Sequence, residues 1–174
     1  MRDEAAFVEF AEAVRGQLRR TAYLMCGDWD QASDHVQEGL IRVYVAWPRL
    51  TRAGREYAYA RKAVVSAFLD HARRRSSTEV PAEPDRNVSS GQDVAESVAV
   101  RAALMSALAD LPLRQRACVV LRYFDDLSIA DTAAVLGCSE GTVKSQTSRA
   151  LASLRCTFEG SPIGGLATEG ARSW

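Results

Sequence analysis

Hydrophobic residues recur at intervals of three or four along most of this chain, which is the spacing that places them on one face of a helix. In residues 1–75 these stripes predict three helices, over 7–25, 30–47 and 56–74. Gly27 marks the end of the first. Pro48 is expected to end the second, because the residue before a proline is disfavoured in helical geometry. The expected buried positions are Phe7, Phe10, Ala11, Val14, Leu18, Ala22 and Met25, then Val36, Leu40, Tyr44 and Trp47, and then Ala60, Ala63, Val64, Ala67 and Phe68.

The pattern stops at residues 76–91, SSTEVPAEPDRNVSSG, which contain two prolines and five serines or threonines but almost nothing large and apolar. Such a segment cannot form a core. Helical spacing returns over 93–109 and again over 114–123, on either side of Leu111–Pro112. We therefore predict an all-α protein of two small helical domains, at residues 1–75 and 93–159. A flexible acidic linker at 76–92 joins them, and residues 160–174 form a loose tail.

Residues 127–154, LSIADTAAVLGCSEGTVKSQTSRALASL, have the pattern of a helix-turn-helix. Ser128 and Asp131 can form a capping box at the start of a first helix, and Gly137 suits the left-handed residue that ends one. Ser139 can then cap a second helix. Ile129, Ala133 and Leu136 form the inner face of the first helix, and Val143, Ala150, Leu151 and Leu154 that of the second. The polar face of the second helix suits contact with a DNA major groove, through Thr142, Lys144, Ser145, Ser148 and Arg149. An ordinary helical hairpin with a solvated face is the alternative.

The net charge is zero, but the charges are distributed in blocks. Acidic residues exceed basic ones by four in residues 1–40 and again in 76–96, whereas 49–75 have an excess of six basic residues. Tyr57 and Tyr59 begin the third predicted helix, and a combination of cations and aromatic rings suits single-stranded nucleic acid. A solubilising helix end, favourable to the helix dipole, is the alternative. The candidate contacts on this helix are Arg61, Lys62, Ser66, Asp70, Arg73 and Arg74.

On the second predicted helix, Asp34, Gln37 and Glu38 share an outward face that could bind a basic protein partner or remain a solvated acidic surface. Nothing near them supplies a nucleophile or a phosphate-binding loop, so we predict that the protein is not an enzyme and has no cofactor. The four cysteines form no CxxC pair and the two histidines lie far from them, so no metal site is expected. With no signal peptide pattern and no apolar run of about 20 residues, we expect a cytoplasmic protein.

The order of these parts resembles the extracytoplasmic-function (ECF) class of bacterial sigma factors, within the sigma-70 family. DWDQASDHVQEGLIRVYVAWPRL resembles the segment that binds the beta-prime clamp helices of RNA polymerase, with Asp34, Gln37 and Glu38 at the matching positions. AYARKAVVSAFLDHARRR resembles the segment that reads the −10 element, with an Asp-x-x-Arg-Arg ending at Asp70, Arg73 and Arg74. The −35-reading domain is matched most specifically by the LP-x-x-x-R run at Leu111, Pro112 and Arg116 and by GTVKS at 141–145. The sequence of the segment AYARKAVVSAFL most resembles that of an actinobacterial subgroup of this class.

The resemblance implies a factor that binds core RNA polymerase and directs promoter-specific initiation at −35 and −10 elements. Its partners would be polymerase, promoter DNA and, in some members, an anti-sigma factor. Ser66 stands where many members have Asn, and Gln146 and Ser148 stand where relatives are often basic or bulky, so base preferences cannot be transferred. Gly39 replaces a position that is often aromatic or small and apolar, which would weaken the helix by up to ~1 kcal/mol. The competing interpretations are a stand-alone DNA-binding regulator, an adaptor that only holds polymerase or an anti-sigma protein, and an enzyme.

Overall fold

The computed structural model describes residues 4–76 and 92–159, with the backbone alone at 76 and at 92–97. Within these ranges every regular element is helical, as the all-α prediction requires. The predicted linker core at 77–91 and the predicted tail at 160–174 lie outside the described residues. The elements are α1 (Glu4–Cys26), α2 (Trp29–Leu50), α3 (Glu56–Ser76), α4 (Gln92–Ala109), α5 (Leu113–Val119), a π-helix η1 (Val120–Phe124), α6 (Ile129–Leu136) and α7 (Glu140–Glu159).

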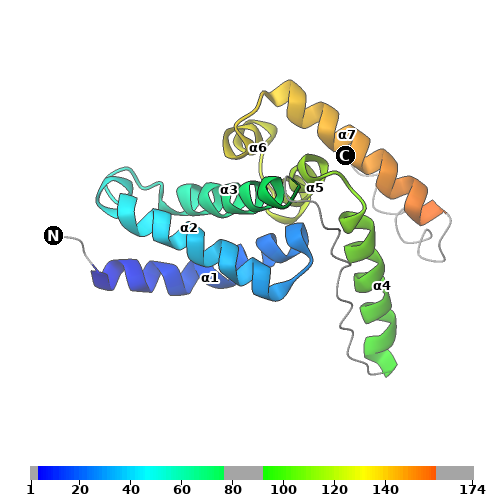
Figure 1. Ribbon diagram of the computed structural model, residues 1–174, viewed down its shortest axis with the longest axis horizontal. Helices are drawn as coiled ribbons and strands as arrows, with labels where there is room; N and C mark the ends of the chain where they lie inside the picture. The colour runs from blue at the N-terminus through cyan, green and yellow to red at the C-terminus, as the bar shows by residue number, and fades with distance from the viewer. Residues whose placement is uncertain (1–3, 77–91, 160–174) are drawn as a thin grey trace.

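Helices α1, α2 and α3 lie side by side and form one end of the molecule (Figure 1). Gly27 adopts a positive φ of 80° and ends α1, and the carboxylate of Asp28 then caps α2 by accepting a hydrogen bond from the Gln31 amide at 2.7 Å. The apolar stripes meet in a shared core. Its buried members are Ala11, Leu18, Ala22, Ala32, Val36, Leu40, Val43, Trp47, Leu50, Ala60 and Val64.

The prediction that Pro48 ends the second helix is wrong, because α2 continues through Pro48 to Leu50. Trp47 keeps its helical conformation because its side chain is buried and packs against the rings of Phe7 and Phe10. The amide of Thr51 donates to the carbonyl of Trp47 and closes the last turn beyond the proline. Tertiary packing therefore overrides the local preference of the residue before proline.

The helix-turn-helix is formed by α6 and α7, and the residues that cap it were predicted correctly, although one bond of the predicted capping box differs. The Ser128 hydroxyl accepts from the Asp131 amide at 3.0 Å and donates to the Asp131 carboxylate, instead of that carboxylate returning to the Ser128 backbone. Gly137 is left-handed, at φ 61° and ψ 43°. The Ser139 hydroxyl accepts from the Thr142 amide at 3.1 Å and so begins α7. These caps fix the angle at which α7 leaves α6.

The single helix predicted over 114–123 is instead two elements, α5 followed by the π-helical turn η1. The Asp125 amide donates to the Val120 carbonyl five residues earlier, which closes this wider turn. Asp126 follows with a positive φ of 51°, a conformation that aspartate tolerates better than most residues. The helix thus ends at this turn, four residues before α6 begins.

Buried residues from both halves of the chain form one continuous apolar cluster. Met25 of α1 and Val65 and Phe68 of α3 belong to it. The remaining buried members come from α5, η1 and the helix-turn-helix: Ala117, Cys118, Val120, Leu121, Leu127, Ala133, Leu136 and Val143. Helix α6 accordingly lies beside α3 in Figure 1.

Candidate functional site

The outward face of α2 is acidic at one end and apolar at the other. Asp34 and Gln37 are exposed, while Glu38 is partly covered and paired with Arg42 at 2.5 Å. One and two turns further on, Ile41 and Val45 are 58% and 64% exposed. The intervals from Asp34 to Glu38, Ile41 and Val45 are four, three and four residues, so all four side chains share one face. Ile41 and Val45 were missed from the sequence, although this spacing could have shown that they fall outside the buried stripe.

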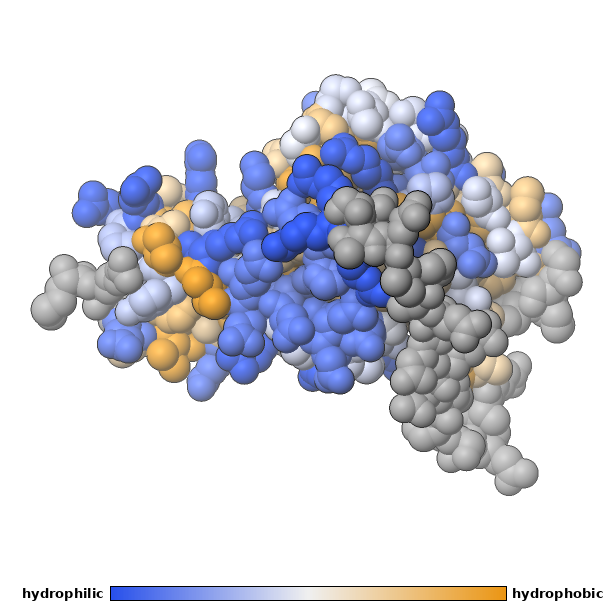
Figure 2. All heavy atoms as spheres, viewed as in Figure 1, coloured by the Kyte–Doolittle hydropathy of each residue, from blue (hydrophilic) through white to orange (hydrophobic). Residues whose placement is uncertain are grey.

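This face remains outside because the opposite side of α2 is fully used by the core. His35, Val36, Leu40 and Val43 are buried there. In Figure 2, hydrophobic surface is visible toward the left end of the molecule, bordered by hydrophilic side chains. Ile41 and Val45 lie one turn apart and so form a small apolar patch next to the carboxylates, and exposed apolar patches with polar rims are found at protein-binding surfaces.

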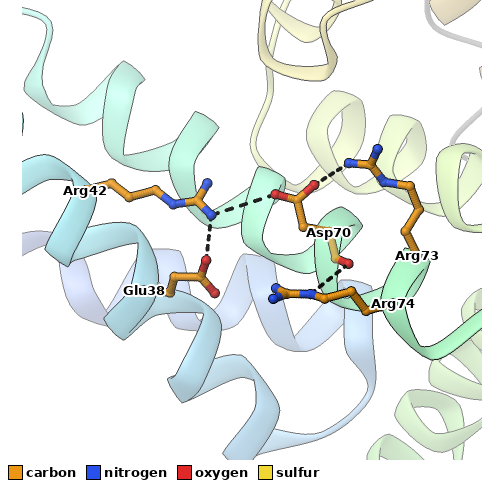
Figure 3. A network of polar contacts seen from close by, with 5 residues as sticks. All are labelled: Glu38, Arg42, Asp70, Arg73 and Arg74. Atoms are coloured by element: carbon orange, nitrogen blue, oxygen red, sulfur yellow. Dashed lines mark hydrogen bonds and ion pairs between the residues drawn. The ribbon is translucent and has the colours of Figure 1, made fainter. Parts of the chain in front are cut away.

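At the end of α3, Asp70 is the centre of a network of cations, shown in Figure 3. Arg73 forms a close ion pair with its carboxylate, and Nε of Arg74 donates to its backbone carbonyl at 3.4 Å. Arg42 of α2, already paired with Glu38, lies 3.8 Å from the second oxygen of Asp70. Arg73 is 78% exposed, and exposed ion pairs contribute little to stability. The Arg73 guanidinium therefore lies at the surface, paired with Asp70 but open to solvent.

The other predicted contacts on α3 are placed differently from one another. Lys62 is exposed and Ser66 is half-buried. Arg61 is turned inward: its Nε lies 3.2 Å from a carboxylate oxygen of Asp125, and the two side chains are only 12% and 4% exposed. The Arg61 guanidinium also lies over the ring of Tyr57, 4.6 Å from its centre. Asp125 was not singled out from the sequence, because no local pattern links it to a residue 64 positions earlier.

Burial dominates the electrostatics of Asp125. It raises the pKa of that carboxyl above its ordinary value, and the opposing hydrogen bond from Thr21 and the charge of Arg61 offset only part of the effect. The Thr21 hydroxyl donates to the Asp125 carboxylate at 2.6 Å. A charge in this position is costly to keep out of water unless it is paired, so the contact depends on all three side chains.

The outer face of α7 is polar and carries the predicted DNA contacts together. Lys144, Ser145, Ser148 and Arg149 are exposed, and Thr142 is half-buried with its hydroxyl 2.9 Å from that of Ser139. Lys144 and Ser148 line an open cleft of about 330 Å³ between η1 and α7. Arg122 and Arg155 line the same cleft and were missed from the sequence, since they lie outside the GTVKS segment. The face thus brings exposed hydroxyls and several cations together on one side of α7.

Comparison with known proteins gives the two halves separate matches. Residues 10–78 match the family described as Sigma-70 region 2, and residues 101–154 match Sigma-70, region 4. The chain is 38% identical over 167 residues to the RNA polymerase sigma-E factor of Streptomyces avermitilis, covering 93% of this chain and 92% of that relative. The chain belongs to the sigma-70 family of RNA polymerase sigma factors.

Other relatives place this sigma factor in the ECF group. It is 34% identical over 152 residues to the ECF RNA polymerase sigma factor SigM of Mycobacterium tuberculosis, covering 87% of this chain and 76% of that one. A solved structure of the sigma factor RpoE in complex with the anti-sigma factor NepR from Bartonella quintana has a TM-score of 0.67 at 23% identity, over 88% of this chain and 97% of that chain. The last likeness shows a shared fold.

The LP-x-x-x-R run of this sigma factor has a structural explanation. Arg116 donates to the carbonyls of Ala109 and Leu111, at the corner between α4 and α5, and Nη1 donates at 2.7 Å to the carbonyl of Met25 in α1. Burial lowers the pKa of its guanidinium, and the charges of Cys26 and Asp110 oppose this shift. One side chain therefore fixes the corner of the second half against the first.

A pocket of about 240 Å³ lies between the end of α1 and helices α2, α3 and α5 of the sigma factor, lined by Cys26, His35, His71 and Arg116 among others. Burial raises the pKa of Cys26 to about 11, which keeps its thiol protonated at neutral pH. In the described ranges no cluster of three or more His, Cys, Asp or Glu is arranged to hold a metal. Over the same ranges no helix is long and apolar enough to cross a bilayer.

Proposed function

We propose that this sigma factor binds core RNA polymerase through the outer face of α2 and recognises promoter −10 and −35 elements through α3 and α7. The protein acts by binding, has no chemistry of its own and works in the cytoplasm. The observation that carries this proposal is the occurrence of three exposed faces of different chemistry on three helices. The faces on α2 and α3 lie within the region 2 match, the face on α7 lies within the region 4 match, and all three belong to one chain.

The α2 face suits the beta-prime clamp helices as a partner. Asp34, Gln37 and Glu38 offer acceptors to a basic surface, and Ile41 and Val45 provide the apolar area that a stable protein contact needs. Charged rim groups mainly guide association, whereas buried apolar side chains slow dissociation. We assign the three polar residues to orientation and the two apolar residues to affinity.

The α3 face suits a separated promoter strand. Lys62, Arg73 and Arg74 can meet phosphates. The Ser66 hydroxyl can donate or accept a hydrogen bond with a base, and the Asp70 carboxylate can accept one. Arg61 adds a further cation when it is released. Single strands are bound by this combination of cations with aromatic rings, and Tyr57 and Tyr59 begin the same helix. The strand that fits this face is the melted −10 region.

The α7 face suits duplex DNA at the −35 element. Lys144 and Arg149 are long cations on a capped helix, Ser145 and Ser148 are short hydroxyl donors between them, and Thr142 is another in the first turn. Long cations reach phosphates and guanine edges, and short side chains let the helix approach the groove floor. Two separate DNA contacts joined in one protein strengthen each other through effective concentration. Losing either one is therefore expected to cost more than its own contacts.

Run-off transcription tests the proposal. Core polymerase is mixed with the purified chain and a library of promoter fragments, and transcripts sharing −35 and −10 sequences are expected. Lys144→Ala/Arg149→Ala is the −35 variant, and Arg52→Ala, an exposed cation in the loop between α2 and α3, is its control. Promoter-specific DNA binding by the chain without polymerase would favour a stand-alone regulator. Polymerase binding without specific transcripts would favour an adaptor.

A further inference from the structure

The two halves of the described chain are held together by an interface that is apolar in its interior. Met25, Val65 and Phe68 meet Leu121 and Leu127 within one buried cluster. All of these residues are less than one tenth exposed. Such continuity is the mark of elements that pack as one body. In this arrangement α3, the proposed −10 helix, lies against the half that carries α7.

Polar groups cross the same interface as well, and the contact of Asp125 with Arg61 is largely buried. The Asp125 carboxylate accepts from Thr21 of α1 and lies 3.2 Å from Nε of Arg61 in α3. Arg116 donates from the other half to the Met25 carbonyl. Of these groups, Asp125 is the one that faces a residue of the proposed −10 surface.

Asp125 is aimed by its backbone. It follows the π-helical turn, whose amide-to-carbonyl bond spans five residues, and it precedes Asp126 with a positive φ. A π turn inserts extra backbone into a helix and rotates every later side chain, and such turns occur frequently at functional positions. An uninterrupted α-helix would direct residue 125 elsewhere. The unusual backbone at residues 120–126 therefore helps to place the Asp125 carboxylate beside Arg61.

Arg61 differs from the other cations of α3 in what it can reach. Arg73 is 78% exposed and Lys62 is exposed, but the Arg61 side chain is 12% exposed and covered by a residue from the other half. A carboxylate binds an arginine in the same way as a phosphate does, through charge-assisted contacts to the guanidinium. While this pair is in place, the Arg61 guanidinium is covered by Asp125.

We infer that Asp125 is an internal competitor of promoter DNA: it holds Arg61 in a closed form of the free chain, and strand capture by α3 requires the two halves to separate. This inference rests on the proposed −10 role of α3. A binding-competent form that is only a minor population lowers the apparent affinity by its fraction. The closed form therefore limits binding to stray single strands before polymerase is present.

The test uses the full chain with Asp125→Lys, which places a like charge against Arg61. Small-angle X-ray scattering is expected to show a larger radius of gyration. A fluorescent single-stranded DNA pool of random sequence is expected to bind about tenfold more tightly or better, if the open form of the wild type is a tenth or less of the population. Glu140→Lys is the matched control, because it is an exposed acid of the same half with the same change in charge. It should alter neither measurement to this extent.

The charge swap Arg61→Glu with Asp125→Lys is expected to restore the compact radius. Thr21→Val is the second variant, for use if Asp125→Lys fails to fold. It removes the hydroxyl that donates to Asp125, so amide hydrogen exchange in α3 and α6 should become faster while the helical content is unchanged. A compact Asp125→Lys chain, or an equal gain of DNA binding by Glu140→Lys, would overturn the inference. A larger radius of gyration of Asp125→Lys without tighter binding of single-stranded DNA would show that Asp125 does not compete with DNA. Failure of the proposed function itself is recognised separately, as the absence of specific run-off transcripts with the wild type.

Discussion

A Cβ atom placed on Gly39 of α2 would lie 2.6 Å from Cγ2 of Val64 in α3 and 3.1 Å from the Val64 amide nitrogen. The two helices therefore approach as closely as their backbones permit, and only a residue without a side chain fits at this crossing. Since α2 carries the proposed polymerase face and α3 the proposed −10 face, Gly39 fixes their relative position. The sequence suggested that Gly39 weakens its helix, whereas the structure shows what its small size makes possible.

Gly39→Ala is expected to destabilise the fold by about 1–3 kcal/mol, the usual cost of forcing an added methyl group into a packed core. Chemical denaturation measures this change. Gly16→Ala is the control, because no atom lies within 4 Å of its added Cβ. It should raise the free energy of unfolding by roughly 0.5–1 kcal/mol through better helix propensity. Equal free energies of unfolding for the two variants would show that the α2–α3 crossing can accommodate an added methyl group.

Ile41→Ser combined with Val45→Ser is expected to weaken binding to core polymerase by about 1–3 kcal/mol, since each side chain would lose apolar burial in the complex. Both are more than half exposed in the free chain, so the free energy of unfolding should change by less than about 0.5 kcal/mol. A fluorescence titration with core polymerase measures the binding. Val8→Ser, 48% exposed on α1, is the control. Unaltered polymerase affinity would assign the patch to another partner.

Arg149→Ala is expected to cost about 1–3 kcal/mol at one −35 position if the guanidinium reads a base, and to weaken all sequences uniformly if it contacts phosphate. Footprints of the polymerase–sigma complex on wild-type and base-substituted −35 sites separate the two cases. Arg155→Ala, at the cleft beside η1, is expected to produce the uniform pattern. Footprints that do not respond to Arg149→Ala at all would remove it from the interface.

Acidification is expected to destabilise the first three helices through His35. Burial lowers the pKa of His35 below its ordinary value of 6.5, and the neighbouring His71 lowers it further, while Glu38 and Asp34 oppose the shift. The unfolded chain therefore takes up the proton first, so this contribution to stability is present above pH 6.5 and is lost as the pH falls below it. Denaturation between pH 7.5 and about pH 5 measures the slope.

The control for this pH dependence is a pair of substitutions. His35→Gln should flatten the slope, and His71→Gln should reduce it without abolishing it, because desolvation of His35 is the larger cause. A slope that persists unchanged in His35→Gln would place the responsible group elsewhere.

Local signals made much of this fold predictable from the sequence. The caps at Ser128 and Ser139 and the left-handed Gly137 each depend on a few adjacent residues, and all three are where the spacing placed them. Pro48 misled because its local preference was opposed by the packing of Trp47 in the core.

The features that escaped prediction depend on residues that are distant in sequence. Nothing local to Asp125 indicates that it meets Thr21 and Arg61. The π turn that aims it has no sequence pattern comparable to a cap. Ile41 and Val45 are a different case, since their positions on the outward face could have been found from the spacing to Asp34. The assignment of individual contacts to polymerase and DNA stays a prediction.

Arg42 has a consequence for how variants of this protein are interpreted. It is the counter-ion of Glu38 on its own helix and lies 3.8 Å from Asp70 on the next. Removing the Glu38 carboxylate frees this guanidinium to neutralise Asp70, which in turn loosens Arg73. A defect in strand capture caused by a substitution at Glu38 is therefore no proof that Glu38 touches DNA, and only paired substitutions that include Arg42 can assign it.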